Sequence, residues 1–377
     1  MTGRRPAILV LEDGRTFHGE AYGSVGETFG EAVFSTAMTG YQETLTDPSY
    51  HRQVVVMTAP HIGNTGVNDE DPESGRIWVA GYVVRAPARR SSSWRARRSL
   101  DDELRAQGVV GICGIDTRAL TRHLRERGAM RVGVSSVERD GGELRRRVLA
   151  SPPMVGADLS SAVSTPSRYT VAARGEHRYT VAAIDMGIKR NVPRRLAERG
   201  VTTHVMPVGT TIEDLLALRP DAVFFSPGPG DPATADQPVA LAREVMTRRL
   251  PLFGICFGSQ ILGRALGLST YKLSYGHRGV NQPVLDRSTG KVEVTSHNHG
   301  FAVNAPVGRP LDTAFGEVEV SHVCLNDGVV EGLRARDIPA FTVQYHPEAA
   351  AGPHDADYLF DRFVELIEGT GDRGKRT

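Results

Sequence analysis

A cysteine in a glycine-flanked turn is the side chain in this sequence best suited to covalent chemistry. Cys256 lies in GICFGSQ, with Gly254 and Gly258 two positions to either side. This spacing is typical of a tight strand-to-helix turn that presents a nucleophile, and the start of a helix favours the thiolate, the reactive form of cysteine. Because cysteine is also a common core residue, the motif alone leaves a nucleophile and an inert filler about equally favoured.

The second candidate is His346-Pro347-Glu348. A thiol nucleophile needs a base and later an acid for the leaving group, and an imidazole oriented by a carboxylate supplies both. An isolated His-x-Glu is more often a solvated surface pair. This one follows the apolar run AFTVQY, and its place at the end of a strand favours the catalytic interpretation.

The third candidate is SPGPGDP, in which Gly228 and Gly230 allow backbone N–H groups to face a ligand. Attack on a carbonyl creates an oxyanion that preorganised donors must stabilise. The N–H groups of Gly228 and Phe257 are candidates for this role. The alternative is an ordinary Pro/Gly turn between a strand and a helix.

The elements that must position these residues alternate between strand and helix. VAAID is followed by NVPRRLAERG, THVMPV by TIEDLLALRP, DAVFFS by QPVALAREVMTRRL, and PLFGI by FGSQILGRALG. This order predicts an α/β fold with a doubly wound, mostly parallel sheet. Ligands of such folds bind at the carboxyl ends of the strands. We therefore expect the three candidate loops to converge on one crevice.

The amino-terminal part has a different pattern, which predicts a mixed α/β domain. Short strands break at glycines, and two helices are expected: one capped by Ser99 and ended near Gly108, the other capped by Asp116 and ended near Gly128. We expect this domain over residues 1–155, a linker over 156–178, where small and polar residues replace the periodic pattern, and the second domain over 179–377.

Composition excludes several classes of function. The formal charge of the 377 residues is +1, which gives no electrostatic preference for nucleic acid or membrane. Cys113, Cys256 and Cys324 fit neither a disulfide framework nor a metal motif, and we interpret Cys113 and Cys324 as buried fillers. The first apolar run is too short for a signal peptide and no run is long enough to span a membrane. We expect a cytoplasmic protein that binds neither nucleic acid nor membrane.

Two weaker signals are discounted. The run Arg89–Arg98, RRSSSWRARR, is more typical of a solvated loop or a protein interface than of a nucleic-acid site, because no nucleic-acid motif accompanies it. His297 and His299, with His277 nearby in the sequence, could bind a metal. No acidic residue or cysteine has ligand spacing to them, so we expect no metal.

These motifs resemble those of a known family. SPGPGDP, GICFGSQ and HPE resemble class I glutamine amidotransferase domains. EDGRTFHGEAYG, MTGYQETLTDPSY, PHIGNTGVN, GIDTRALTRHLRERGAM and SHNHGFAV resemble the small, glutamine-hydrolysing chains of carbamoyl phosphate synthetases, and the likeness covers nearly the whole sequence. The amino-terminal motifs separate these small chains from other amidotransferases of the class.

The resemblance implies a role for each matched residue. Cys256 would be the nucleophile, His346 the general acid and base, and Glu348 the residue that orients His346. Gly228 and Phe257 would form the oxyanion hole. The residues implied to contact L-glutamine are Ser49, Gly228, Gly230, Phe257, Gln260, Asn298, Gly300 and Phe301.

The resemblance also implies a partner. The sequence has no G-x-x-x-x-G-K-[ST] loop, and this chain is expected to need no cofactor. A separate large chain would use ATP, Mg and bicarbonate, and would receive ammonia from this chain through a tunnel. Pyrimidine and arginine biosynthesis are the pathways implied.

Ser259 departs from the family, which usually has histidine at this position, and we expect weaker glutamine affinity with intact chemistry. Two other functions stay open: an amidotransferase that serves a different acceptor, and a regulatory subunit without turnover.

Overall fold

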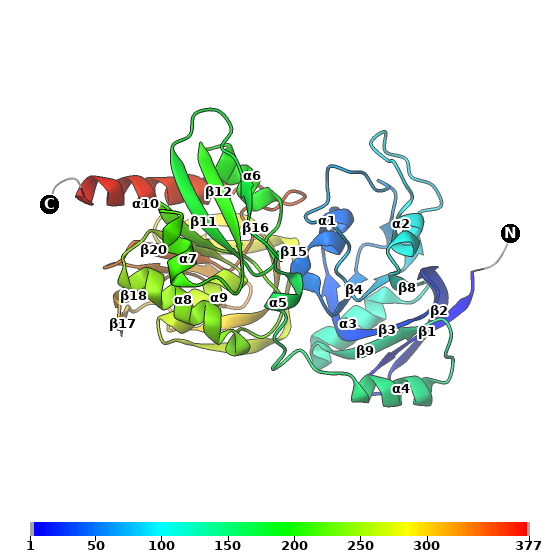
Figure 1. Cartoon of the computed structure of the whole chain (residues 1–377). Helices are drawn as coiled ribbons and strands as arrows, with labels where there is room; N and C mark the ends of the chain where they lie inside the picture. The colour runs from blue at the N-terminus through cyan, green and yellow to red at the C-terminus, as the bar shows by residue number, and fades with distance from the viewer. Residues whose placement is uncertain (1–3, 375–377) are drawn as a thin grey trace. The chain divides into compact units, whose positions relative to one another are not determined.

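The computed structural model describes residues 4–374, with side chains through residue 370, and separates into two compact units (Figure 1). Unit 1 is the chain up to Ala157 together with Ser274–Gly279, and unit 2 is Asp158–Leu273 together with the chain from Val280 onward. The segment predicted as a linker, 156–178, begins at this boundary. Most of it belongs to unit 2, where it forms α5 (Ser160–Val163) and the edge strand β10 (Tyr169–Val171).

Unit 1 is built on a closed barrel in the order β1-β2-β8-β6-β4-β3-β9. The pairs β3·β4, β4·β6 and β6·β8 are parallel and the other barrel pairs are antiparallel. The interior side chains, such as Leu9, Val54 and Val132, come from every barrel strand and pack with α3. The barrel strands are β1 (Pro6–Leu11), β2 (Thr16–Gly23), β3 (Glu27–Ser35), β4 (Gln53–Met57), β6 (Gly81–Val84), β8 (Val110–Cys113) and β9 (Met130–Ser135).

The helices of unit 1 begin where the sequence predicts them. The Ser99 side chain accepts a hydrogen bond from Asp102 N, and that of Asp116 accepts one from Ala119 N, so both predicted caps are confirmed. These helices are α2 (Leu100–Ala106) and α3 (Thr117–Arg127). The remaining elements are α1 (Tyr41–Thr46), the 3-10 turn η1 (Pro48–Tyr50), α4 (Gly141–Ala150), and the short paired strands β5 (His61–Ile62) and β7 (Ala86–Pro87).

Unit 2 contains an 11-stranded sheet in the order β10-β12-β11-β13-β14-β20-β19-β18-β15-β16, with β17 paired to β18. Its central strands from β12 to β20 are all parallel, which confirms the predicted doubly wound sheet. These parallel strands are β11 (Tyr179–Asp185), β12 (Val201–Pro207), β13 (Ala222–Phe225), β14 (Leu252–Ile255) and β20 (Ala340–Val343).

An antiparallel extension, which was not predicted from the sequence, continues the sheet beyond β20. β19 pairs antiparallel with β20 and with β18, and β18 pairs antiparallel with β15 and β17. The strands of this extension are β15 (Ser269–Asp286), β16 (Lys291–Asn304), β17 (Leu311–Thr313), β18 (Gly316–Cys324) and β19 (Val330–Ala335).

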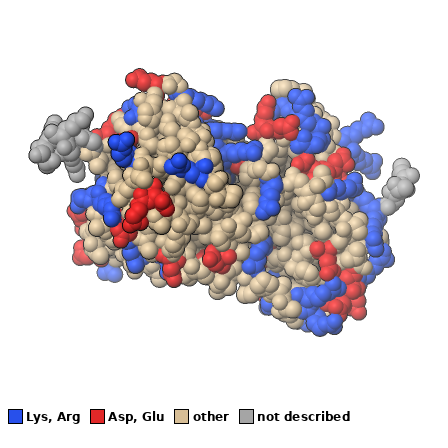
Figure 2. Space-filling model, viewed as in Figure 1, with Lys and Arg blue, Asp and Glu red and all other residues tan. Residues whose placement is uncertain are grey.

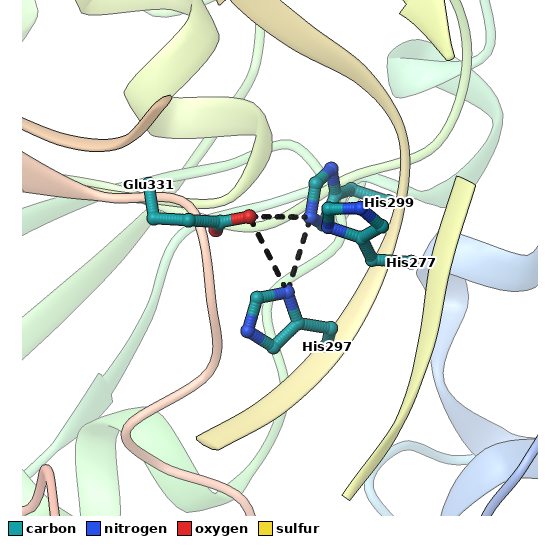
Figure 3. A group of neighbouring side chains, drawn as sticks. All are labelled: His277, His297, His299 and Glu331. Carbon is teal, nitrogen blue, oxygen red and sulfur yellow. Dashed lines mark hydrogen bonds and ion pairs between the residues drawn. The ribbon is translucent and has the colours of Figure 1, made fainter. Parts of the chain in front are cut away.

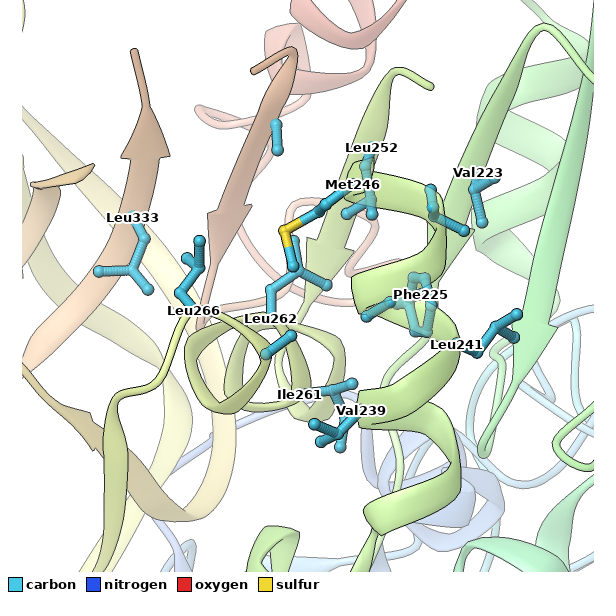
Figure 4. Packing of buried hydrophobic residues seen from close by; sticks show 14 of the residues in the cluster. Val223, Phe225, Val239, Leu241, Met246, Leu252, Ile261, Leu262, Leu266 and Leu333 are labelled. Atoms are coloured by element: carbon cyan, nitrogen blue, oxygen red, sulfur yellow. The ribbon is translucent and has the colours of Figure 1, made fainter. Parts of the chain in front are cut away.

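Helices cover both faces of the parallel strands because alternate side chains point to opposite faces. Val223 and Phe225 pack toward α8 and α9 (Figure 4), whereas Ala222 and Phe224 pack toward α6 and α10. Each face therefore has its own hydrophobic core. The helices are α6 (Asn191–Ala197), α7 (Ile212–Ala217), the 3-10 turn η2 (Pro232–Thr234), α8 (Asp236–Thr247), α9 (Phe257–Ala265) and α10 (Tyr358–Gly374).

Charged side chains of both signs are interspersed over the visible face of each unit (Figure 2). Two arginines of the basic run in unit 1 are paired with acids: Arg95 with Glu70 and Asp71, and Arg98 with Asp69 and Glu103. This pairing fits the interpretation of the run as a solvated loop. Within residues 4–374, no helix has the length and apolar character needed to cross a membrane.

Candidate active site

Cys256 occupies a strained turn between β14 and α9. Its backbone has φ 55° and ψ −104°, a conformation that residues other than glycine rarely adopt. The flanking glycines make the turn fit, because a Cβ on Gly258 would lie 2.1 Å from Phe225 O and one on Gly254 would lie 2.8 Å from the backbone of Gly258. Strain held in place by close packing is typical of a nucleophile turn.

The thiol of Cys256 is buried beside β16. Its Sγ lies 3.6 Å from Asn298 O, and its backbone N–H donates to Val343 O at 2.9 Å. The side chain is 2% exposed. The structure thus joins the turn at the end of β14, the end of β20 and the middle of β16 around one sulfur atom.

His346 and Glu348 form a buried ion pair just beyond β20. His346 Nδ1 lies 2.7 Å from Glu348 Oε1, and His346 N donates to Ser296 O at 2.8 Å. Nε2 of His346 has no hydrogen-bond partner among the described residues. One ring nitrogen is therefore held by the carboxylate, and the other is left for proton transfer.

Lys189 and Asn191, which no sequence motif singled out, complete the surroundings of Glu348. Lys189 Nζ lies 2.7 Å from Glu348 Oε1, and the Asn191 side-chain amide donates to Glu348 O. Both residues follow β11, whose carboxyl end is an edge where ligands of such folds bind. Their place after a strand was the signal that could have identified them.

The charges of this group shift the titration of both partners. Burial and Lys189 lower the pKa of His346, but Glu348 and Cys256 raise it by more, so its pKa lies above the ordinary value. Burial raises the pKa of Glu348, but Lys189 and His346 lower it further, so the carboxyl stays ionised.

The SPGPGDP loop is tied to the cysteine turn. Gly258 N donates to Ser226 O at 3.1 Å, which connects α9 to the start of the loop. A Cβ on Gly228 would lie 2.3 Å from Met186 O, so only glycine fits there. Phe257 is the first residue of α9, and its N–H has no acceptor within the helix. Both candidate oxyanion donors thus belong to segments that meet at Cys256.

The residues expected to contact glutamine lie in four segments. Gln260 lies on α9, and Asn298, Gly300 and Phe301 lie on β16. Gln260 Nε2 donates to Phe301 O at 2.8 Å, so α9 and β16 are held together beside the thiol. Gly230 lies in the SPGPGDP loop. Ser49 belongs to η1 of unit 1, and its contact with glutamine stays a prediction.

Ser259 points into the packing between α9 and the sheet. Its hydroxyl donates to Thr342 Oγ1 at 2.8 Å, and the residue is 2% exposed. The weaker affinity for glutamine stays a prediction. The local role that the structure gives Ser259 is a hydrogen bond to β20.

The remaining histidine and cysteine signals also have defined places. Glu331 of β19 lies beside His297 and His299, so the acidic neighbour that sequence spacing did not reveal is supplied by another strand. Cys113 and Cys324 are buried free thiols, as predicted. Burial raises the pKa of Cys113, and it raises that of Cys324 to about 12, which keeps both thiols protonated.

Comparison with protein families gives a match in each unit. Residues 9–134 match the family described as carbamoyl-phosphate synthase small chain, CPSase domain. Residues 182–366 match the class-I glutamine amidotransferase family. The first match lies within unit 1, and the second covers the loops that carry Cys256, His346 and Glu348.

Curated relatives are similar over nearly the full length. The carbamoyl phosphate synthase small chain of Streptomyces avermitilis is 71% identical over 366 residues, covering 97% of this chain and 96% of the relative. The small chain of Streptomyces coelicolor is 70% identical, with 97% of both chains covered. That of Mycobacterium tuberculosis strain H37Rv is 60% identical, covering 97% of this chain and 99% of the relative.

Proposed function

Because the chain belongs to the carbamoyl phosphate synthase small-chain family and carries a glutamine amidotransferase domain, it is a glutamine-hydrolysing subunit, and we propose that Cys256, His346 and Glu348 perform the hydrolysis. The observation that supports this assignment most directly is the buried contact of 2.7 Å between His346 Nδ1 and Glu348 Oε1, just beyond β20, the strand whose Val343 O accepts a hydrogen bond from the Cys256 backbone N–H.

The first half of the reaction releases ammonia. The Cys256 thiolate attacks the side-chain amide carbon of L-glutamine and forms a C–S bond. The oxyanion is stabilised by the N–H groups of Gly228 and Phe257. His346 then gives its proton to the amide nitrogen, the C–N bond breaks, and ammonia departs. The γ-glutamyl group remains on the enzyme as a thioester.

The second half restores the enzyme. Neutral His346 takes a proton from a water molecule that attacks the thioester, and the returning electron pair expels the Cys256 thiolate with release of L-glutamate. Glu348 holds the imidazole in one orientation and stabilises its charged form. Lys189 keeps Glu348 ionised, because the ammonium lowers the pKa of the carboxyl.

The ammonia is delivered to a partner. We propose that a separate large chain receives it through an enclosed tunnel and makes carbamoyl phosphate from bicarbonate with ATP and Mg, in the cytoplasm. This chain would supply no cofactor of its own. Enclosure matters because ammonia released to solvent at neutral pH is protonated and loses its nucleophilicity.

The decisive experiment compares the wild-type chain with Cys256→Ser, each assembled with the large chain. We expect the variant to lose glutamate release and glutamine-dependent synthesis while ammonia-dependent synthesis of carbamoyl phosphate continues. Cys324→Ser, at the other buried thiol of unit 2, is the matched control and should keep glutaminase activity. Glutamate release by Cys256→Ser at the wild-type rate would overturn the assignment.

A further inference from the structure

A second buried group of ligating side chains lies in unit 2, outside the proposed triad. It consists of His297 and His299 on β16 and Glu331 on β19, which we call the β16–β19 cluster (Figure 3). Their side chains are at most 1% exposed. Figure 3 also draws His277, from the segment that clusters with unit 1; the β16–β19 cluster is defined by the three residues of unit 2.

The hydrogen bonds around the cluster fix which ring nitrogens face its centre. His299 Nδ1 lies 3.0 Å from Phe301 O, and a carbonyl only accepts, so Nδ1 carries the proton. The Thr295 hydroxyl donates to Gln282 O at 2.9 Å and lies 2.7 Å from His297 Nε2, so its oxygen accepts a hydrogen bond from that nitrogen, which carries the ring proton. In the neutral rings, the lone pairs of His297 Nδ1 and His299 Nε2 therefore face the centre.

The three inward-facing atoms have the spacing of metal ligands. His297 Nδ1 is 3.2 Å from His299 Nε2, and Glu331 Oε1 is 3.6 Å and 3.5 Å from these two nitrogens. Ligand atoms of a tetrahedral zinc site, at about 2.0–2.1 Å from the ion, lie about 3.3–3.4 Å from one another. The three atoms thus approximate one face of such a tetrahedron.

The chemistry of the cluster also suits a cation, because Glu331 places a carboxylate beside two imidazoles in the protein interior. Two imidazole nitrogens and one carboxylate oxygen form a donor set that zinc binds. The contacts of the rings with Thr295 and Phe301 O are the outer interactions that orient ligating histidines.

From these observations we propose that His297, His299 and Glu331 bind one divalent cation of the zinc class. This is a structural site distinct from the triad, with one coordination position left for water or another donor. It links β16 to β19 through a bond that the sheet itself does not provide.

The position of the site connects it to the nucleophile. Asn298, whose backbone oxygen lies 3.6 Å from Cys256 Sγ, stands between the two ligating histidines. Phe301 O accepts from both His299 and Gln260 of α9. A cation held here would restrain the segment of β16 beside the thiol. This role concerns positioning and does not depend on the proposed hydrolysis, because metal binding is measured without turnover.

The test uses the full-length Cys256→Ser chain, so that zinc cannot bind the catalytic thiol. After incubation with Zn²⁺ and removal of loose metal, we expect one equivalent of zinc by elemental analysis. With Co²⁺ we expect the visible absorption of a tetrahedral site with nitrogen and oxygen ligands. Adding Glu331→Gln should weaken Zn²⁺ affinity by more than about tenfold, since even outer-shell changes cost 10–100-fold.

The matched control is His354→Asn, which removes an exposed histidine of unit 2 and should leave both the stoichiometry and the affinity unchanged. Circular dichroism verifies that the Glu331→Gln chain is folded, and His299→Asn provides a second ligand variant if it is not. Less than about a tenth of an equivalent of zinc in the parent chain would overturn the proposal. So would equal zinc binding by the parent and a folded ligand variant, which would indicate adventitious metal only.

Discussion

Two buried histidine–carboxylate groups in unit 2 use the same residue types with different geometry. In the first, Glu348 Oε1 lies 2.7 Å from both His346 Nδ1 and Lys189 Nζ, so the carboxylate is paired with two basic side chains. In the second, Glu331 lies 3.5 Å and 3.6 Å from two imidazoles, too far for hydrogen bonds and near the separation of atoms that share a cation.

This difference separates proton transfer from cation binding. The first group fixes one nitrogen of His346 and leaves the other for a reacting proton. The second group directs two ring nitrogens and one oxygen at a common point. A short contact between one imidazole nitrogen and a carboxylate oxygen is suited to an acid or base. Longer separations among donor atoms that point toward a common centre are suited to binding a metal ion.

The largest loss of glutaminase activity is expected from Glu348→Gln, which tests the role assigned to the first group. The amide neither holds the imidazole in the same state nor stabilises its charged form, and loss of this support in a related triad costs about 10⁴ in kcat. We expect glutaminase kcat to fall at least a hundredfold, measured as glutamate release. Glu319→Gln, at an outer ion pair of β18, should keep the wild-type rate. A loss below tenfold for Glu348→Gln would contradict the role of this carboxylate.

The next effect concerns the buried ammonium. Lys189→Met removes one partner of a buried ion pair, which typically costs about 3–5 kcal/mol of stability. Lys189 lowers the pKa of His346, so its removal raises that pKa. Neutral His346 then becomes available only at higher pH, and the rising limb of the profile of kcat/KM against pH should move in the alkaline direction. A shift toward acid would contradict this electrostatic account.

Measuring both zinc content and pH-dependent activity on a variant of each group tests whether the two groups act independently. Glu331→Gln should lower zinc content and leave the pH limb assigned to His346 in place, since the main influences on its pKa are burial, Lys189, Glu348 and Cys256. Lys189→Met should move the pH limb and keep one equivalent of zinc. Both are measured on the same preparations by elemental analysis and pH-dependent glutamate release. If both variants changed both readouts, the two groups would be one functional unit.

The smallest effect is expected at Ser259. Its hydrogen bond to Thr342 is buried, and its removal in Ser259→Ala should lower the free energy of unfolding by about 1 kcal/mol. We expect KM for glutamine to change less than twofold, because the hydroxyl is directed into the sheet. A double-mutant cycle with Thr342→Val measures the pairwise contribution in urea unfolding. A several-fold change in KM would favour the sequence-based hypothesis of altered affinity.

The sequence determined the elements and the residues whose types carry the chemistry. Alternating strand and helix patterns predicted the parallel strands from β11 to β14, and Ser99 and Asp116 predicted two helix starts, because these signals are local. The glycines around Cys256 also predicted its turn from local sequence, because close backbone approach requires a residue without a side chain.

Only the tertiary structure decided which distant residues meet. Lys189 reaches Glu348 from the loop after β11, and Glu331 reaches His297 and His299 from β19. The antiparallel extension that carries these histidines was also missed, because strand pairing across long sequence separations leaves no local periodicity to detect. The types of side chain follow directly from the sequence. The distances that distinguish an ion pair from a set of metal ligands are set by the packing of strands far apart in the chain.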